Sequence, residues 1–203
     1  LSLLKHRNFK FYKINIEKKS DLRKLFLKYK IDKVINLAAQ AGVRHSLNHP
    51  EDYASNNLIG FFNVIECSRL AKVKHFIFAS TSSVYGLNKK LPFSETDPVN
   101  HPSQFYAATK RSNEVMAHSY SCIYGLNCTG VRFFTVYGPW GRPDMALFKF
   151  VKNTLEKKSI DIFNHGKHVR DFSYIDDVVK CLKKIKTKYP KKYKIVNSFN
   201  PSK

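Results

Sequence analysis

The stretch Phe76-Ile-Phe-Ala-Ser-Thr-Ser-Ser-Val-Tyr-Gly86 decides the fold class of this chain. A short apolar run that ends in small and hydroxyl-bearing residues is typical of a buried strand. Similar strands are predicted over residues 32–39 and 127–134, and helix-length segments with apolar periodicity lie between them. This alternation predicts an α/β protein whose parallel sheet is covered by helices on both faces.

Three amphipathic segments are predicted to form the covering helices. The first spans residues 20–30, with Ser20 as its N-cap and leucine, phenylalanine and tyrosine on its apolar face. The second spans residues 56–71, and the third runs from Tyr106 to Tyr124. Each is long enough to return the chain between two parallel strands.

The pattern changes after Gly141, where the start of a smaller lobe is predicted. The predicted elements there are a helix, a short strand and a second helix, at residues 145–156, 159–163 and 174–185. We therefore divide the chain into a sheet domain at residues 1–141 and part of a second lobe at residues 142–203.

The charge of the chain is strongly positive. Thirty-six lysine and arginine residues against 15 acidic residues give a formal net charge of +21. Such an excess favours a partner such as nucleic acid or anionic lipid, whereas the alternative is a lysine-biased composition spread over solvated faces. Lysine pairs recur along the whole length, from Lys18-Lys19 to Lys191-Lys192, and form no single basic stripe. We therefore predict no specific nucleic-acid partner.

Cysteine usage favours a reducing compartment. The four cysteines are scattered and form no C-x-x-C pair: Cys67, Cys122, Cys128 and Cys181. Plain core packing and a cytoplasmic location are the expected consequences, and no metal site is predicted. No run approaches the ~20 apolar residues of a membrane span, and the apolar start of the chain is too short for a signal peptide.

Tyr106 and Lys110 are the leading candidates for acid–base chemistry. Their four-residue spacing places both on one helix face, where an ammonium group favours the phenolate and lowers the tyrosine pKa from ~10. The Thr81 hydroxyl would then relay a proton between that phenol and a substrate alcohol. Thr81, Tyr106 and Lys110 are therefore predicted to be catalytic. The alternative is a packed tyrosine beside an exposed lysine.

Three predicted strands end in small or polar residues. These ends are Ala38-Ala39-Gln40, Ser80-Thr81-Ser82 and Phe134-Thr135. Ligands of parallel sheets bind at the carboxyl ends of the strands, so these three ends are expected to meet at one site.

Five segments follow one another at a familiar spacing. They are Leu37-Ala-Ala-Gln-Ala-Gly-Val-Arg44, Thr81-Ser-Ser-Val-Tyr-Gly86, Tyr106-Ala-Ala-Thr-Lys110, Arg132-Phe-Phe-Thr-Val-Tyr-Gly-Pro-Trp-Gly-Arg-Pro-Asp-Met-Ala146 and Arg170-Asp-Phe-Ser-Tyr-Ile-Asp-Asp177. Together they resemble the extended short-chain dehydrogenase/reductase family, which includes NAD-dependent sugar-nucleotide epimerases and dehydratases. The resemblance covers nearly the whole chain and implies a Rossmann-like doubly wound parallel sheet.

The resemblance implies NAD as the cofactor and residues 1–141 as an NAD-binding domain. The residues that match the family's cofactor-binding positions are Asn15, Ile16, Leu37, Ala38, Ala39, Gln40, Ala41, Asn56, Tyr106, Lys110 and Phe134. The family usually has an aspartate where Asn15 stands.

The reaction implied by the resemblance is epimerisation at carbon 4 of a UDP-sugar. Tyr106 takes the sugar hydroxyl proton while NAD takes the hydride, and the resulting 4-keto sugar turns over before the hydride returns. The matching substrate-binding positions are Arg44, Thr81, Ser82, Ser83, Thr135, Arg142 and Arg170. Relatives that perform dehydration or decarboxylation usually have an acidic residue where Ser83 stands, which favours epimerisation over these alternatives.

The resemblance further implies UDP-glucuronate, interconverted with UDP-galacturonate, as the substrate. Its carboxylate suits a set of hydroxyls, backbone N–H groups or an arginine. Thr81, Ser82 and Ser83 offer the hydroxyls, and Arg44 and Arg142 offer the charge.

The sequence departs from the family at both ends. The family opens with a Gly-x-x-Gly-x-x-Gly turn that holds the NAD pyrophosphate, and this sequence has none. Residue 1 matches a position before the family's third strand, and members continue beyond a strand predicted at 194–198. We expect a fragment that lacks two strands and a helix, leaves a sheet edge uncovered and turns over weakly or not at all. The other hypothesis is an inactive remnant that serves as a binding or interaction module. Homodimers are expected in the full-length family.

Overall fold

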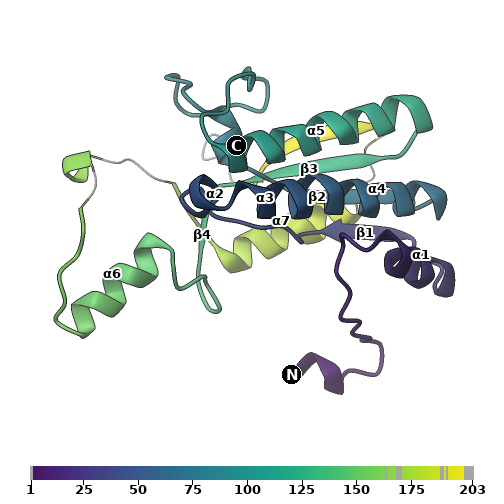
Figure 1. Cartoon of the computed structure of the whole chain (residues 1–203), viewed down its shortest axis with the longest axis horizontal. Coiled ribbons are helices and arrows are strands. Elements are labelled where there is room, and N and C mark those ends of the chain that lie inside the picture. Colours follow the sequence, from purple (N-terminus) through teal and green to yellow (C-terminus); the bar gives the residue numbers. More distant parts are fainter. Residues whose placement is uncertain (1, 163, 168–170, 188–189, 191, 199–203) are drawn as a thin grey trace.

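The computed structural model describes residues 2–162, 164–167, 171–187, 190 and 192–198. Its main sheet has four parallel strands in the order β1-β2-β3-β6 (Figure 1). The strands are β1 Lys33–Asn36, β2 His75–Thr81, β3 Cys128–Phe133 and β6 Tyr193–Asn197. All four fall at the predicted places, so the prediction of an α/β fold with a parallel sheet is confirmed.

Helices cover both faces of the sheet. One side carries α1 Lys19–Lys28, α4 Phe61–Leu70 and α5 Phe105–Tyr124, and α7 Ile175–Thr187 lies on the other (Figure 1). Successive residues of a strand point to opposite faces. The cover on both sides therefore explains why β2 is buried along nearly its whole length.

The larger core lies between the sheet and α1, α4 and α5. Phe61 of α4 packs edge-on against Phe76 and Phe78 of β2, with ring centroids 5.7 and 5.3 Å apart. Leu22 of α1 and Ala117 of α5 belong to the same buried cluster. Burial of such apolar surface stabilises the fold by roughly 25 cal/mol per Å².

The N-cap of helix α1 lies two residues earlier than predicted. This N-cap is Lys18, which makes no side-chain cap, and Ser20 lies inside the first turn. The Lys18 carbonyl already accepts hydrogen bonds from the N–H groups of Asp21 and Leu22, at 3.1 and 3.3 Å. The prediction of Ser20 as N-cap is therefore wrong. Asp21 in the first turn instead places negative charge at the positive end of the helix dipole.

The predicted helix over residues 56–71 is longer and less regular than expected. The chain is helical from α3 Pro50–Tyr53, through the π-helical segment η2 Ala54–Gly60, into α4. Proline is favoured in the first turn of a helix because its missing N–H has no helical partner there. A Cβ at Gly60 would lie 2.6 Å from Ile16 Cδ1, so glycine allows the N-terminal segment to approach this helix closely.

The part that follows β3 holds a second, two-stranded parallel sheet of β4 Thr135–Tyr137 and β5 Phe172–Tyr174. Helix α6 Ala146–Leu155 stands away from the main sheet (Figure 1). The predicted strand at 159–163 is wrong, because the described residues 159–162 form no strand and β5 takes the place beside β4. The remaining elements are η1 Ser2–Lys5, α2 His45–Asn48, η3 Ser82–Tyr85 and η4 Asn164–Gly166.

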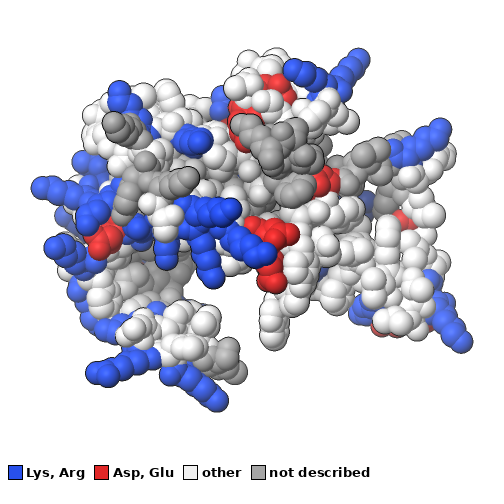
Figure 2. Space-filling model, turned by 180° about the vertical axis from the view of Figure 1, so that it is seen from behind, with Lys and Arg blue, Asp and Glu red and all other residues white. Residues whose placement is uncertain are grey.

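The surface reflects the composition. Figure 2 shows lysine and arginine side chains over much of one face, densest toward the end that carries α1 and α7. Within the described ranges, no helix is both long and apolar enough to cross a membrane.

Candidate active site

The end of β2 forms one wall of the candidate site. Thr81 is the last residue of β2, is only 7% exposed, and lies opposite Phe133 of β3. Its Oγ1 accepts a hydrogen bond from the Ser83 N–H at 3.2 Å, which starts η3 and leaves Ser82 and Ser83 half-buried beside it. The local sequence therefore folds three hydroxyls into one tight turn at the carboxyl edge of the sheet.

Gly86 ends this turn with a φ of 56°. A Cβ at this position would lie 2.3 Å from the backbone oxygen of His101. The turn therefore requires glycine both for its left-handed backbone and for the close approach of the 101–102 segment.

The start of α5 forms the facing wall. Lys110 is 3% exposed, and its Nζ donates a hydrogen bond to the Ala79 carbonyl oxygen at 3.0 Å. Tyr106, one turn earlier, is half-buried, and the Thr81 hydroxyl lies near enough to its phenol to act on the phenol's pKa. The structure thus brings Thr81, Tyr106 and Lys110 together at the carboxyl end of the parallel sheet, as predicted. It also excludes the alternative of an exposed lysine.

The predicted effect of Lys110 on Tyr106 is wrong. Burial raises the pKa of the Tyr106 phenol above its ordinary value, while the hydrogen bond with Thr81 and the positive charge of Arg142 act in the opposite direction. Burial also lowers the pKa of the Lys110 amine to about 8, because a charged group loses its hydration there. The lysine binds the backbone of β2 and not the phenol, which explains why spacing alone misled.

Arg142 reaches the same site from the segment that follows β4. A Cβ at Gly42 would lie 3.2 Å from Arg142 Nη2 and 3.5 Å from the Tyr53 hydroxyl oxygen. The Tyr53 hydroxyl donates to the Gly42 carbonyl at 2.6 Å, and its ring lies edge-on to Tyr106 with centroids 6.0 Å apart. Arg142 is also paired with Asp144, whose Oδ1 accepts from the arginine Nε at 2.9 Å. Tyr106 therefore lies near both a positive charge and a second phenol.

The segment that leaves β1 is held by Asn57, which sequence reasoning missed. Asn57 is buried, its Oδ1 accepts from the Gln40 N–H at 2.8 Å, and its Nδ2 donates to the Gln40 carbonyl at 3.0 Å. Nδ2 also donates to Thr109 Oγ1 on α5, at 3.1 Å. Asn56, which the resemblance indicated, instead donates to the Asp52 carbonyl at 2.9 Å. The sequence signal that could have identified Asn57 is its helical spacing from the inward-facing Phe61, which places both residues on one helix face.

The remaining predicted residues of the cofactor group lie around this edge. Leu37 and Ala38 are exposed where β1 ends, whereas Ala39, Gln40 and Ala41 are half-buried. Asn15 is exposed and bonds the neighbouring Glu17, whereas the Ile16 carbonyl accepts from Asn63 Nδ2 at 3.0 Å. Phe134 is half-buried and packs on the small core of Val84, Tyr85 and Val99.

Three of the predicted substrate-binding residues remain to be placed. Arg44 is exposed and precedes α2. Thr135 begins β4 and donates its backbone N–H to the Asp171 carbonyl at 3.3 Å. Arg170 lies outside the described residues.

A mainly apolar cavity of about 260 Å³ adjoins the site between β4 and α6. Thr135 and Arg142, both predicted to bind substrate, contribute to its lining. The rest of the lining is Val136, Tyr137, Gly138, Gly141, Met145, Leu147, Phe148 and Val151. The described residues hold no group of three or more His, Cys, Asp or Glu side chains arranged for a metal ion.

The fold and the site define a Rossmann-like α/β protein with an acid–base site at the carboxyl ends of its strands. Comparison with known proteins identifies the family. Residues 2–197 match the NAD dependent epimerase/dehydratase family. The chain therefore belongs to this family.

Individual relatives agree with that assignment. Protein CapI of Staphylococcus aureus is 53% identical over 178 residues, which cover 88% of this chain and 53% of that protein. UDP-glucuronate 4-epimerase 4 of Arabidopsis thaliana is 54% identical over 171 residues, which cover 82% of this chain and 39% of the plant protein.

A solved structure, that of UDP-glucuronic acid 4-epimerase from Bacillus cereus in complex with UDP-glucuronic acid and NAD, superimposes with a TM-score of 0.88 and 36% identity. The match covers 97% of this chain and 62% of that one. The chain thus spans about half the length, or less, of the two curated relatives named above.

Proposed function

We propose that this chain supplies the catalytic part of an NAD-dependent UDP-sugar 4-epimerase. The observation that carries the proposal is the meeting of Thr81, Tyr106 and Lys110 at the end of β2 in a member of this family. A phenol, a hydroxyl and an amine at one strand end are the groups needed to move a proton on and off a sugar alcohol.

The residues present fit part of NAD. The small side chains of Ala38 and Ala39 leave the backbone at the end of β1 accessible, and Lys110 offers donors one strand away. We propose that Leu37–Ala41, Asn57, Lys110 and Phe134 hold the ribose and nicotinamide. When bound, NAD supplies the acceptance and return of a hydride at carbon 4.

The chain's own residues handle the proton. Tyr106 takes the proton of the 4-hydroxyl and returns it, and the nearby Thr81 hydroxyl favours the phenolate. Burial makes the phenolate costly, so the positive charge of Arg142 has to offset that cost. A substrate carboxylate bound to Arg142 alone would neutralise part of the positive charge that favours the phenolate. We therefore propose that the hydroxyls of Ser82 and Ser83 share the carboxylate with Arg142.

The proposed substrate is UDP-glucuronate, converted to UDP-galacturonate. The named relatives from Arabidopsis thaliana and Bacillus cereus carry this substrate in their own names. The three hydroxyls of the Thr81–Ser83 turn and Arg142 supply donors for a uronate carboxylate, and the apolar cavity beside β4 offers room for the nucleotide. Ser83 also argues against a dehydratase, because that chemistry needs an added acid or base.

We also propose a division of labour along the chain. Residues 1–141 bind NAD together with α7 and β6, because β6 is a strand of the main sheet and α7 covers that sheet. The predicted division at residue 142 is therefore kept only for the start of the substrate-binding lobe, to which Arg142 and α6 belong. The sequence holds no Gly-x-x-Gly-x-x-Gly turn for the pyrophosphate, so the 203-residue polypeptide alone is expected to hold NAD weakly and to turn over slowly.

A chimera tests this proposal. Residues 2–197 of this chain replace the matching part of the Bacillus cereus enzyme, and proton NMR follows the conversion of UDP-glucuronate to UDP-galacturonate. Turnover well above that of the 203-residue polypeptide supports the proposal. A folded chimera that retains NAD and does not epimerise UDP-glucuronate contradicts it, and an inactive binding module then becomes the better explanation.

A further inference from the structure

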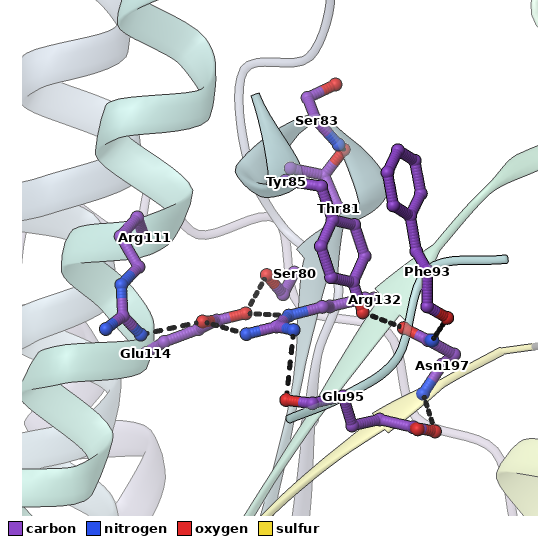
Figure 3. Close-up of polar contacts among 10 residues, drawn as sticks. All are labelled: Ser80, Thr81, Ser83, Tyr85, Phe93, Glu95, Arg111, Glu114, Arg132 and Asn197. Atoms are coloured by element: carbon purple, nitrogen blue, oxygen red, sulfur yellow. Dashed lines mark hydrogen bonds and ion pairs between the residues drawn. The ribbon is translucent and has the colours of Figure 1, made fainter. Parts of the chain in front are cut away.

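A buried carboxylate lies one helical turn beyond Lys110 and takes no part in the proposed reaction. Glu114 of α5 is 0% exposed and accepts four hydrogen bonds (Figure 3). Arg132 of β3 supplies two of them through Nε and Nη2, each at 2.9 Å. Ser80 Oγ donates at 2.7 Å and Arg111 Nη1 at 3.0 Å. An ionised carboxylate with this many donors is held in one place and one orientation.

The Arg132 side chain, the partner of Glu114, is also held in one position. Arg132 lies opposite Ser80 in the sheet register and is 2% exposed. Its guanidinium stacks on the ring of Tyr85, 4.8 Å from the ring centroid, and the Tyr85 hydroxyl donates to Asn197 Oδ1 of β6 at 2.7 Å. Figure 3 shows these side chains as one connected group beneath the Thr81–Ser83 turn. The carboxylate is therefore tied to three strands of the main sheet.

The contacts between α5 and β2 involve three consecutive strand residues. Lys110 Nζ donates to the Ala79 carbonyl, Glu114 accepts from the Ser80 hydroxyl, and Tyr106 lies near Thr81, the next residue of the strand. Residues at four-residue intervals lie on one helix face, so this face of α5 meets three consecutive strand residues. Of these three residues of α5, Glu114 alone is also held by a buried bidentate ion pair, which it forms with Arg132 of β3.

We propose that Glu114 is a positioning residue that fixes the height of Tyr106 and Lys110 above the Thr81 end of β2. A role of Glu114 in catalysis rests on the proposed function, whereas its effect on the positions of Tyr106 and Lys110 does not. A helix held only by apolar contacts can shift by a fraction of an ångström, and catalytic groups tolerate little misplacement. The competing explanation is a buried ion pair that contributes to stability alone.

The experiment compares Glu114→Gln with Glu66→Gln in the 203-residue chain. Glu66 is a matched control because it accepts a bidentate pair of hydrogen bonds from Arg69 and a third from Tyr120 on α5, at 3.0 Å, remote from the site. Two readouts are taken at pH 7.5: the rate of Lys110 acylation by mass spectrometry, and the ¹³Cζ resonance of Tyr106, assigned with Tyr106→Phe. Thermal unfolding is recorded for both variants.

We expect Glu114→Gln to raise Lys110 acylation several-fold and to move the Tyr106 resonance, whereas Glu66→Gln lowers the unfolding temperature without either change. Equal readouts in the two variants overturn the proposal. If Glu114→Gln does not fold, Ser80→Ala removes a single donor, and an unchanged Lys110 and Tyr106 in that variant also overturns it. Neither readout needs NAD or a sugar nucleotide, so failure of the proposed function would leave this result intact.

Discussion

The Lys110 Nζ lies 3.0 Å from the Ala79 carbonyl oxygen and donates to it, which binds the catalytic-type lysine to the backbone of β2. The amine is almost completely buried, and burial lowers its pKa to about 8. In this geometry the lysine holds the helix to the strand, and Thr81 and Arg142 act on the Tyr106 phenol.

The first prediction concerns the pH dependence of stability. The pKa of the buried Lys110 amine is about 8 in the folded state, against a reference value of 10.5. Between about pH 8 and pH 10.5 the folded state therefore binds fewer protons at this amine than the unfolded state does. Stability attributable to Lys110 therefore rises with pH from about 8 to 10.5, by at most about 3 kcal/mol. Urea unfolding of the chain and of Lys110→Met at pH 7 and pH 10 measures this difference. Parallel pH curves for the two proteins would show that the amine is not buried as described.

The second prediction concerns Tyr106. In the chimera, Tyr106→Phe should lower kcat by about 10²- to 10⁴-fold, because the proton of the sugar hydroxyl loses its acceptor. Binding of NAD should persist. Tyr120→Phe is the control, since Tyr120 lies on the same helix and bonds Glu66 instead. Comparable losses of kcat in both variants would rule out a specific role for Tyr106.

The third prediction concerns the glycine that shapes the Thr81–Ser83 turn. Gly86→Ala forces a side chain onto a backbone with φ 56° and ψ −119°, outside the left-handed α region, at a cost of about 1–3 kcal/mol, and its Cβ meets the His101 oxygen at 2.3 Å, so the backbone has to move. Gly125→Ala also has a positive φ, 66°, but its ψ of 17° lies in the left-handed α region and nothing lies within 4 Å of the added Cβ. Urea unfolding should show the larger loss of stability in Gly86→Ala. Equal losses would contradict both the backbone strain and the close approach of His101 at Gly86.

The fourth prediction separates Asn57 from its neighbour. Asn57→Ala leaves both backbone groups of Gln40 without their side-chain partner and should cost about 1–3 kcal/mol. Asn56→Ala removes a single exposed hydrogen bond to Asp52 and should cost less. In the chimera, Asn57→Ala should also weaken the binding of NAD, measured by fluorescence titration. A larger effect of Asn56 would favour the assignment made from family resemblance.

The sequence predicted the order of strands and helices because each apolar run and helical repeat is local. The four strands of the main sheet therefore fell in place. The strand predicted at 159–163 was wrong because an alternating pattern carries no information about which strand will pair with it. In the structure β4 pairs with β5. The predicted N-cap of α1 was wrong by two residues because Lys18 takes the capping position without a side-chain bond.

The candidate site was predictable where spacing along one element fixes proximity, as for Tyr106 and Lys110. It was not predictable where the burial of a side chain determines its pKa or its hydrogen-bond partners. The direction of the Tyr106 pKa depends on what surrounds the phenol, and the Asn57 contacts join residues 17 and 52 positions apart. The role of Glu114 likewise needed the facing strand, because its partners Ser80 and Arg132 lie on β2 and β3.

The most direct test of the central claim is the ratio of kcat/KM for UDP-glucuronate and UDP-glucose in the chimera. A site that bonds a carboxylate leaves buried polar groups unpaired when the neutral sugar binds, so we predict a preference for UDP-glucuronate on the order of 10²-fold or more. Arg142→Ala should reduce that preference and also slow the reaction of UDP-glucose, since the Tyr106 phenolate then loses the positive charge beside it. Equal kcat/KM values, or a preference for UDP-glucose, would contradict the assignment of UDP-glucuronate as the substrate.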